Sequence, residues 1–437
     1  MAKDTVLIVD SDAAWASALL AALRHAGFEA WWAPDGVQGL AMAHTLVPDV
    51  VVLDLWLPGL DGLELLAALR AAGSAAVAIV TTESGNVPLA VRALKLGAAD
   101  YLEKPCAFES VLRAICHLKQ PKQREAQARR FTAEQVASVA APAALSALPR
   151  AVPAGLLPQG KRRQRTLRRP VVLHGQGLQT GLRTGVVLAP LPPNSGIVFH
   201  DLATGERMPA LVDFVTSTDF CTSLGKNGVA AWTVEHLLSA LCAYGVTNVL
   251  VKLSSEVPIM DGSALAFAQA LAEAGIEEQP ATVEELVVDR CYTVGQSPFR
   301  SLVIEPYDGL RVTYRLQYPP PIGVQEVSYE HRDGSSYRRE IAPARTFASV
   351  QDVERLHALG LVAGGRLNNV ILLDGGRVIN TTPLRFPDEL ARHKILDLLG
   401  DLCLLGRPVR GHLRASMTGH TENIALVRCL RQALLRA

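Results

Sequence analysis

The sequence predicts a multidomain protein in which an N-terminal α/β domain precedes a larger α+β region. Three observations support this fold class. The chain has 437 residues, which is more than one hydrophobic core usually organises. Residues 1–118 alternate five times between a short apolar run and a helix-periodic stretch. From about residue 166 onward, strand-like and helix-like stretches follow without such regularity, which is typical of α+β domains.

The first segment, residues 1–118, is predicted to form a parallel sheet with helices on both faces. Its strand-like runs are TVLIVD, EAWWAP, DVVVLDL, AVAIVTT and DYLEKP, and its helix-like stretches are AAWASALLAALRHAG, DGVQGLAMAHTL, DGLELLAALRAAG, VPLAVRALKLGA and FESVLRAICHL. Ligands of such sheets bind at the carboxyl ends of the strands, so a site is expected at that edge.

Residues 119–163 are predicted to be a flexible linker, because they are charged at first and then rich in Ala and Pro. The stretch KRRQRTLRR at 161–169 allows two interpretations. It is either a nucleic-acid patch or the basic end of the linker leading into a strand. The second is favoured, because no helix-turn-helix or aromatic-interleaved pattern follows.

The remaining chain is predicted to form two α+β subdomains, residues 164–280 and 281–437, separated near EAGIEEQPATVEE. Strand-like runs such as NVLVKLS, ELVVDRCYTV and LRVTYRLQY are mixed with four helical stretches. The predicted helices cover residues 233–244, 263–274, 388–405 and 421–435.

Composition excludes several classes of protein. The formal net charge is +1, so no nucleic-acid or anionic-membrane partner is expected. No apolar run reaches about 18 residues, so no transmembrane segment is expected, and acids near the N-terminus argue against an export signal. Seven scattered cysteines without a CxxC pair suit reduced thiols. A cytoplasmic protein is therefore expected.

Polar side chains end four of the predicted strands. Asp10 follows the first strand, Asp54 ends the third, Thr82 ends the fourth and Lys104 follows the fifth. These ends meet at one edge of a parallel sheet. Two carboxylates there can hold Mg²⁺, and a hydroxyl with an ammonium suits a phosphoryl group.

Residues 4–118 resemble the receiver domain of response regulators, through VLIVDSD, DVVVLDLWLPGLDGLELL and VTTESGNVPLAVRALKLGAADYLEKP. The resemblance implies a CheY-like fold. It also implies that Asp54 accepts phosphate from a sensor histidine kinase and that Asp10 helps to bind Mg²⁺. Thr82 and Lys104 would sense the phosphate, with Tyr101 as a rotating switch.

One departure from the receiver family concerns the magnesium site. The family usually has two consecutive acids after the first strand, and this chain has Asp10-Ser11, with Asp12 as the acid that could compensate. Weaker Mg²⁺ binding and signalling without phosphate both stay open. A receiver that only drives dimerisation is a further alternative.

The stretch LARHKILDLLGDLCLLG places His393, Asp397 and Asp401 four residues apart. On a helix these side chains stack along one face, and a His-x-x-x-Asp pair can bind one metal ion. The alternative is an amphipathic helix with a polar stripe. Apolar neighbours argue against it, because unpaired buried acids are costly.

His236 in TVEHLLSAL would complete a set of two histidines and one carboxylate, which is a catalytic zinc arrangement. Its neighbour Glu235 would take a proton from the activated water. The alternative is a surface glutamate beside a packed histidine. In SMTGHTENIAL, His420 could stabilise an oxyanion and protonate an amine, with Asp401 holding its ring. Spacing alone does not bring residues 236 and 393 together.

Residues 164–435 resemble the zinc-dependent UDP-3-O-acyl-N-acetylglucosamine deacetylases (LpxC type), which catalyse the committed step of lipid A synthesis. The matching motifs are RQRTLRRPVVLHGQGLQTG, TVEHLLSAL, EVPIMDGSALAF, ARTFASVQDVERL, LRFPDELARHKILDLLGDLCLLG and GHTENIAL. The implied substrate is UDP-3-O-acyl-N-acetylglucosamine, and the implied architecture is two facing α+β subdomains with the site between them. Residues 363–380 would wall a passage for the acyl chain.

The resemblance also implies a role for each matching residue. His236, His393 and Asp397 would bind Zn²⁺, and Glu235 would be the general base. The remaining roles are His420 as general acid or oxyanion stabiliser, Asp401 as its orienting group, Thr346 as an oxyanion donor and Lys394 as a substrate contact.

Three positions depart from the deacetylase pattern: Gln179 replaces a histidine, Ser223 a cysteine and Ser349 an aromatic residue. None of them removes a metal ligand, the base or the acid, so they bear on fine specificity and rate. Two rival functions remain: a regulatory protein that binds nucleotide-sugar without turnover, and a DNA-binding regulator that uses the basic stretch.

Overall fold

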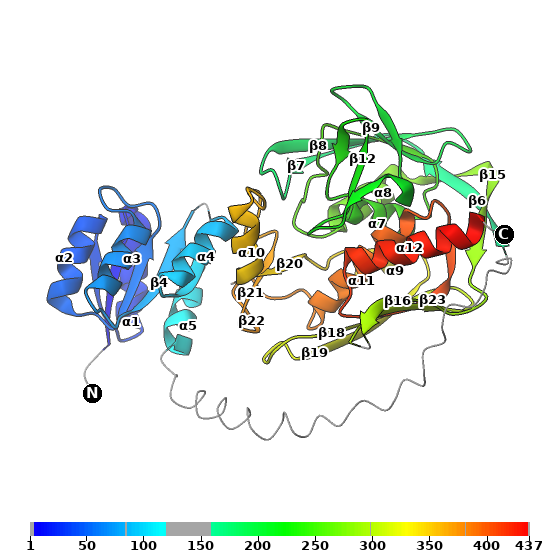
Figure 1. Cartoon of the computed structure of the whole chain (residues 1–437). Coiled ribbons are helices and arrows are strands. Elements are labelled where there is room, and N and C mark those ends of the chain that lie inside the picture. The colour runs from blue at the N-terminus through cyan, green and yellow to red at the C-terminus, as the bar shows by residue number, and fades with distance from the viewer. Residues whose placement is uncertain (1–3, 84, 119–158, 298, 381, 436–437) are drawn as a thin grey trace, which may run out of the picture. The chain divides into compact units, whose positions relative to one another are not determined.

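The computed structural model describes residues 4–83, 85–118, 159–297, 299–380 and 382–435. They form two compact units (Figure 1). One unit runs from Met1 to Ala147 and takes in two short later segments, and the other holds the rest of the chain. The later segments of the first unit are Val350–His357 and Val378–Pro383, and the second unit comprises Leu148–Ser349, Ala358–Arg377 and Leu384–Ala437.

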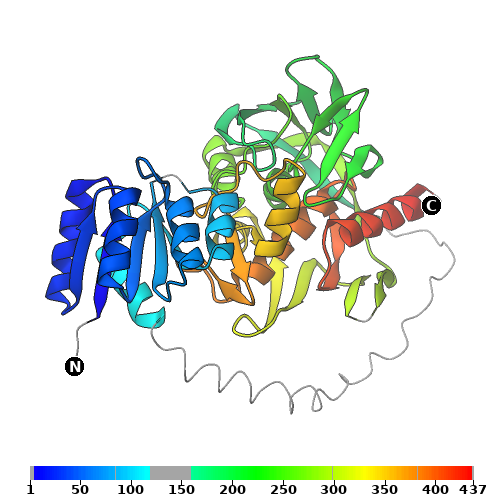
Figure 2. The ribbon, with the colours of Figure 1, turned by 60° about the vertical axis from the view of Figure 1, so that its left-hand side comes forward.

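The N-terminal unit contains the predicted five-stranded parallel sheet, in the order β2-β1-β3-β4-β5. Figure 2 shows helices on both faces of this sheet. β3 is buried along its whole length, which explains why its sequence is a continuous apolar run. The elements are β1 Thr5–Val9, α1 Ala13–His25, β2 Glu29–Ala33, α2 Gly36–Leu46, β3 Val50–Asp54, α3 Gly62–Ala71, β4 Val77–Thr82, α4 Val87–Lys95, β5 Ala98–Glu103 and α5 Phe108–Leu118, and the later segments contribute most of α10 Val350–Ala358.

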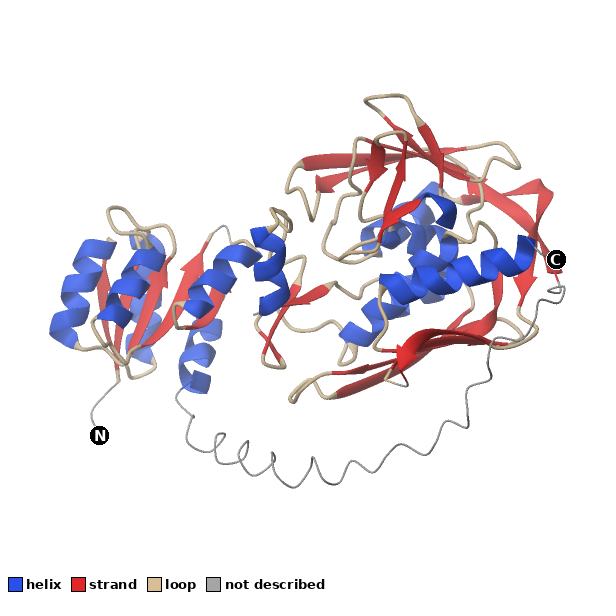
Figure 3. Cartoon of the chain, viewed as in Figure 1, coloured by secondary structure: helices blue, strands red, loops and turns tan. Residues whose placement is uncertain are grey.

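The second unit has helices between its two larger sheets (Figure 3). One sheet has the order β10-β9-β14-β8-β7, with strands β7 Val171–Gln176, β8 Arg183–Pro190, β9 Ile197–Asp201, β10 Arg207–Pro209 and β14 Val249–Leu253. The other has the order β16-β17-β23-β15-β6, and β18 pairs with β23 and β19. Its strands are β6 Gln159–Leu167, β15 Ile276–Val287, β16 Tyr292–Ser297, β17 Arg300–Glu305, β18 Leu310–Gln317, β19 Val324–His331 and β23 Val409–Ser416.

Two small sheets and five helices complete this unit. The helices are α7 Glu235–Ala243, α8 Leu265–Ala274, α9 Gly334–Glu340, α11 Glu389–Cys403 and α12 His420–Leu435, with a short 3-10 turn at Val212–Phe214. The small sheets are β11 Val215–Ser217 with β12 Ser223–Lys226 and β13 Val229–Ala231, and β20 Phe347–Ser349 with β21 Ile371–Asp374 and β22 Arg377–Val378. All four predicted helices are present, and the predicted fold class, a receiver sheet followed by an α+β region, is confirmed.

The basic stretch at 161–169 belongs mostly to β6, which begins at Gln159, inside the segment that the sequence assigns to the linker. β6 pairs antiparallel with the acidic strand β15, so that Lys161 faces Glu284 and Arg165 faces Glu278. Charge complementarity between two strands therefore accounts for these basic residues. The rest of the predicted linker lies outside the described residues. No helix in the described part of the chain is both long enough and apolar enough to span a membrane.

Candidate metal centre and acid-base pair

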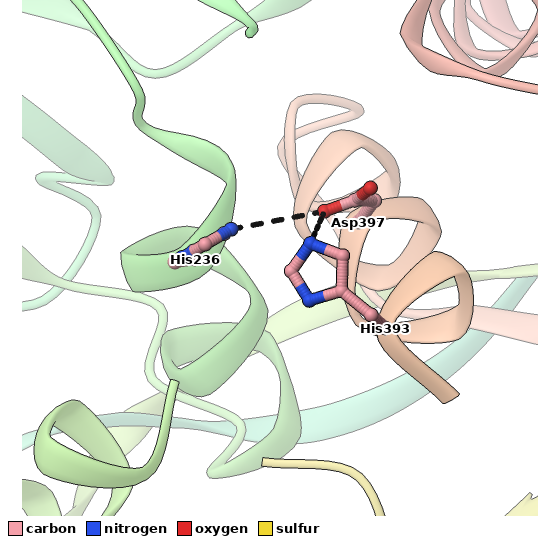
Figure 4. A group of neighbouring side chains, drawn as sticks. All are labelled: His236, His393 and Asp397. Carbon is pink, nitrogen blue, oxygen red and sulfur yellow. Dashed lines mark ion pairs between the residues drawn. The ribbon is translucent and has the colours of Figure 1, made fainter. Parts of the chain in front are cut away.

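Two helices bring the predicted metal ligands together. His236 lies in the first turn of α7, and His393 and Asp397 lie one turn apart on α11. One potential ligand atom from each residue lies within 4.8 Å of the other two (Figure 4). Nε2 of His393 is 3.3 Å and Nε2 of His236 is 3.9 Å from Oδ1 of Asp397. The structure thus places all three side chains around one point.

A glycine permits this approach of α7 and α11. A Cβ atom on Gly400 would lie 2.1 Å from the carbonyl oxygen of Glu235, which is far inside van der Waals contact. The helices can therefore pack closely only because residue 400 lacks a side chain. This contact is what joins residue 236 to residues 393 and 397, which spacing along the sequence does not do.

The ring of His393 is held from behind by the segment before β20. Its Nδ1 lies 3.0 Å from the carbonyl oxygen of Ala344, so Nδ1 carries the proton and the lone pair of Nε2 faces Asp397. One turn earlier on α11, the buried carboxylate of Glu389 binds the backbone N–H and the guanidinium of Arg345. This pair fixes the segment that carries Ala344 to the helix that carries His393.

The protonation of the three residues suits a divalent metal. Burial lowers the pKa of His236 to about 3 and also lowers the pKa of His393, so both imidazoles are neutral. Burial alone would raise the pKa of Asp397, but nearby positive charge, with Lys394 and His420 as the cationic groups, holds it well below its ordinary value. Nδ1 of His236 is buried without a hydrogen-bond partner among the described residues. Two neutral imidazoles and one carboxylate are the donor set of catalytic zinc sites, so the residues fit zinc.

Glu235 lies beside this cluster and is only 3% exposed, so the alternative of a surface glutamate is wrong. Its Oε2 accepts the backbone N–H of Thr222 at 3.0 Å. Burial raises the pKa of Glu235 to about 7, against the opposing effect of His420. A carboxyl group with this pKa can accept and release a proton near neutral pH. His393, Asp397 and Asp401 are also buried, so α11 has no solvent-facing polar stripe there.

His420 opens α12 and points toward α11. Its Nδ1 donates to Oδ2 of Asp401 at 2.8 Å, and Asn423 donates to the same oxygen at 2.9 Å. Burial alone would lower the pKa of His420, but Asp401 raises it to about 9. His420 is therefore an imidazolium at neutral pH, held by a fully buried carboxylate. This arrangement can donate a proton or stabilise negative charge.

The remaining predicted residues, Thr346 and Lys394, stand shortly after Ala344 in the chain and next to His393 on α11, respectively. The backbone N–H of Thr346 donates to the carbonyl of Gly262 at 2.8 Å, and Thr346 stands two residues after Ala344. Nζ of Lys394 is 3.0 Å from Oδ2 of Asp397 and 5.2 Å from the centre of the Phe347 ring. Of the three departures from the deacetylase pattern, Gln179 and Ser223 are buried and Ser349 ends β20.

The receiver residues meet at the carboxyl edge of their sheet. Nζ of Lys104 lies 2.7 Å from Oδ2 of Asp10 and 3.3 Å from Oδ1 of Asp54, and Thr82 and Tyr101 are buried. Burial raises the pKa of Asp54, an effect that Lys104 opposes.

Asp12 does not replace the acid that the sequence lacks at Ser11. Its carboxylate caps α1 by accepting the N–H groups of Ala14 and Trp15. Asp10 and Asp54 therefore offer two carboxylates, and both already contact Lys104. The residues present fit Mg²⁺ only in part.

Sequence reasoning missed three structural contributors to the site. Thr222 contacts Glu235, Asp401 and His420. Its residue type gives no signal, because the contact with Glu235 is made by its backbone N–H. The Arg345–Glu389 pair gives none either, since the two residues are far apart in the chain. Gly400 could have been found, because an isolated glycine inside a long helix often marks close packing.

Comparison with known proteins identifies both parts of the chain. A family model described as UDP-3-O-acyl N-acetylglycosamine deacetylase (LpxC) matches residues 164–432, and a response regulator receiver domain model matches residues 6–116. Both resemblances drawn from the sequence are thereby confirmed.

Individual proteins are similar to one part of the chain or the other. The UDP-3-O-acyl-N-acetylglucosamine deacetylase of Myxococcus xanthus (strain DK1622) is 44% identical over 269 residues, which cover 61% of this chain and 85% of the relative. The enzyme of the same name from Thermodesulfovibrio yellowstonii is 37% identical, covering 61% and 91%. The solved receiver domain of Francisella response regulator 1452 is 28% identical, covers 27% of this chain and 98% of its own, and has a TM-score of 0.26.

Proposed function

Because this chain belongs to the UDP-3-O-acyl-N-acetylglucosamine deacetylase family and carries a receiver domain before the family region, we propose that it hydrolyses the N-acetyl amide of UDP-3-O-acyl-N-acetylglucosamine. The products are acetate and the free amine, and this step would commit the sugar nucleotide to lipid A synthesis. The observation that carries the proposal is a two-histidine, one-aspartate cluster next to a buried carboxyl group and an imidazolium.

Zinc is the proposed metal, held by His236, His393 and Asp397. When bound there, it would polarise the amide carbonyl and lower the pKa of a water molecule. Burial keeps both imidazoles neutral and nearby positive charge keeps the carboxylate ionised, and these are the protonation states that bind a metal ion. Close packing of α7 against α11 holds the three donors in position.

Glu235 is proposed to take the proton from the attacking water. Its Oε2 is engaged by the N–H of Thr222, which leaves Oε1 for the water. His420 is proposed to donate its Nε2 proton to the departing amine, while Asp401 holds the opposite nitrogen. The two groups thus have complementary roles, because one accepts a proton at the start of the reaction and the other supplies one at the end.

Other contributions follow from neighbouring residues. We assign Thr346 as a hydroxyl donor to the negative charge that develops on the carbonyl oxygen, and Lys394 as a substrate contact. Lys394 is supported by its contact with Oδ2 of Asp397, and Thr346 by its place two residues after Ala344, whose carbonyl oxygen contacts His393. Residues 363–380 are assigned to the acyl chain from the family resemblance, and an apolar passage there would gain about 0.8 kcal/mol from each buried methylene.

The receiver is proposed to make the enzyme responsive to a sensor histidine kinase through phosphorylation of Asp54, with Mg²⁺ as the companion ion. Lys104, 3.3 Å from Asp54, would contact the phosphoryl group. A phosphorylated receiver can regulate the enzyme only if its two states contact a partner differently, either in the deacetylase region or in a second receiver of a dimer.

The test of the proposed activity is an acetate-release assay on the full chain. Chelation should abolish turnover, and Zn²⁺ should restore it. Glu235→Ala and His420→Ala should each lower turnover about a hundredfold or more, as expected for a general base or acid. Glu277→Ala, an exposed carboxyl on β15, is the matched control and should match the wild type.

Three results would contradict the proposal. Turnover that persists without metal would remove the zinc mechanism, and near-normal turnover in either site variant would remove that residue's role. Binding of the nucleotide-sugar without any turnover would favour the rival regulatory function. For the receiver arm, rates that are identical before and after a phosphate-donor treatment that labels Asp54 would exclude simple control by phosphorylation.

A further inference from the structure

Thr222 makes hydrogen bonds to both halves of the acid-base pair. It stands immediately before β12 and is fully buried. Its backbone N–H donates to Oε2 of Glu235 at 3.0 Å, and its hydroxyl donates to Oδ1 of Asp401 at 2.6 Å. The same hydroxyl oxygen lies 3.2 Å from Nδ1 of His420. One residue therefore spans the distance between the proposed base and the proposed acid.

The backbone of Thr222 is tied to the start of α7 on both sides. Its carbonyl accepts the N–H of Val234 at 3.3 Å, while its N–H binds the carboxyl group of Glu235. The bond from the N–H of Thr222 occupies Oε2 of Glu235. Both bonds use main-chain atoms of Thr222, so a side-chain substitution at residue 222 leaves them in place.

The hydroxyl of Thr222 acts on the other half of the pair. Its only proton goes to Asp401, so its oxygen can only accept from Nδ1–H of His420. Asp401 and Thr222 then share that proton, and the ring cannot turn without breaking both contacts. Nε2 is thereby left as the nitrogen that faces the substrate.

We propose that Thr222 is a positioning residue that holds the side chains of Glu235 and His420 in fixed positions relative to each other across the metal centre. The backbone sets the orientation of the base, and the hydroxyl sets the orientation of the acid through Asp401. This inference rests on the proposed deacetylase function, and it adds a residue whose role is to hold the two proton-transferring groups rather than to touch the substrate.

A matched pair of substitutions separates this role from simple packing. Thr222→Val keeps the shape and loses the hydroxyl, whereas Thr222→Ser keeps the hydroxyl and loses a methyl group. Loss of a hydrogen bond to a carboxylate is expected to lower kcat about tenfold to a hundredfold. We expect that loss in Thr222→Val only, with KM and zinc content near the wild type, and kcat of Thr222→Ser within about threefold of the wild type.

A double-variant cycle tests whether the hydroxyl acts through His420. In a His420→Ala background, Thr222→Val should cost little further activity, because contacting groups that work together are not additive. Full additivity would overturn the inference. The opposite ranking of the pair, with Ser impaired and Val normal, would also overturn it, because that result would make Thr222 a packing residue.

A measurement without turnover distinguishes this inference from the proposed function. If the wild type releases no acetate, the deacetylase proposal fails, and the Nδ1 proton of His420 decides the role of Thr222. This proton is followed by NMR in the zinc-loaded full chain with labelled histidine. A signal that shifts in Thr222→Val but not in Thr222→Ser supports the inference, and an unchanged signal in both overturns it.

Discussion

Replacing Gly400 by alanine should separate the two helices that carry the metal ligands. The added Cβ would lie 2.1 Å from the carbonyl oxygen, 2.8 Å from the carbonyl carbon and 3.0 Å from the Cα of Glu235. Ordinary contacts of a carbon atom begin near 3.5 Å, so α7 and α11 must move apart by about 1 Å or more. All three clashing atoms belong to the backbone, so no side-chain rotation can relieve them.

Two opposing effects set the expected stability change of Gly400→Ala. Alanine is favoured over glycine inside a helix by about 1 kcal/mol, whereas overpacking typically costs about 1–3 kcal/mol. The net effect should be neutral to destabilising. The site should suffer more, because a displacement of about 1 Å can cost about a hundredfold in activity. His236 would move with α7, away from His393 and Asp397.

Zinc affinity and kcat/KM of Gly400→Ala test this reasoning directly. We expect at least a tenfold weaker zinc affinity, measured by competition with a chromophoric chelator, and a kcat/KM about a hundredfold lower. Gly419→Ala is the control, because a Cβ at Gly419 meets nothing within 4 Å. A Gly400→Ala protein that is more stable than the wild type and keeps its zinc affinity would refute the role given to this close contact.

Three further predictions concern other parts of the molecule. The raised pKa of His420 stabilises the fold fully below its ordinary value of 6.5, and this contribution is lost as pH rises through about 9. His420→Gln should therefore flatten the fall of Tm over that range, and an unchanged slope would contradict this. Ser11→Asp should strengthen Mg²⁺ binding at least tenfold in a tryptophan-fluorescence titration, whereas Ser11→Asn should not. Equal Mg²⁺ affinities of Ser11→Asp and the wild type would refute the statement that the site lacks a third carboxylate. Glu389→Gln should destabilise the fold by about 3–5 kcal/mol, because the buried guanidinium of Arg345 then loses the negative charge that Glu389 supplies; Arg345→Met with Glu389→Leu should recover most of this in thermal unfolding.

The receiver fold could be predicted from the sequence because its strands are short, apolar and separated by amphipathic helices. The inner strands β1, β3 and β4 are buried on both faces, so their hydrophobic runs are continuous and easily recognised. The strand-end positions of Asp10, Asp54 and Lys104 follow from that alternation alone. The side-chain direction of Asp12 cannot be predicted in this way, because an acid at the start of a helix can either cap the helix or face a metal.

The metal centre was predictable only in part. The spacing of His393 and Asp397 along one helix indicates a pair of ligands. His236 is far from both in the sequence, so spacing cannot predict that it lies next to them. That link depends on a backbone contact at Gly400, and such contacts leave no periodic pattern. Thr222 was missed for a related reason, since a threonine outside a motif looks like any other buried hydroxyl.

The charges of the site argue that its buried acids are there for a cation. Asp397 and Asp401 of α11 pair with Lys394 and His420, and Glu235 of α7 adds a third buried carboxyl group, whose pKa burial raises to about 7. A third buried carboxyl group beside two balanced ion pairs is costly, and packing alone gives no reason to keep it. A dication between the histidines and Asp397 would reverse the sign of the local charge. The site would then favour the negative charge that amide hydrolysis places on the carbonyl oxygen.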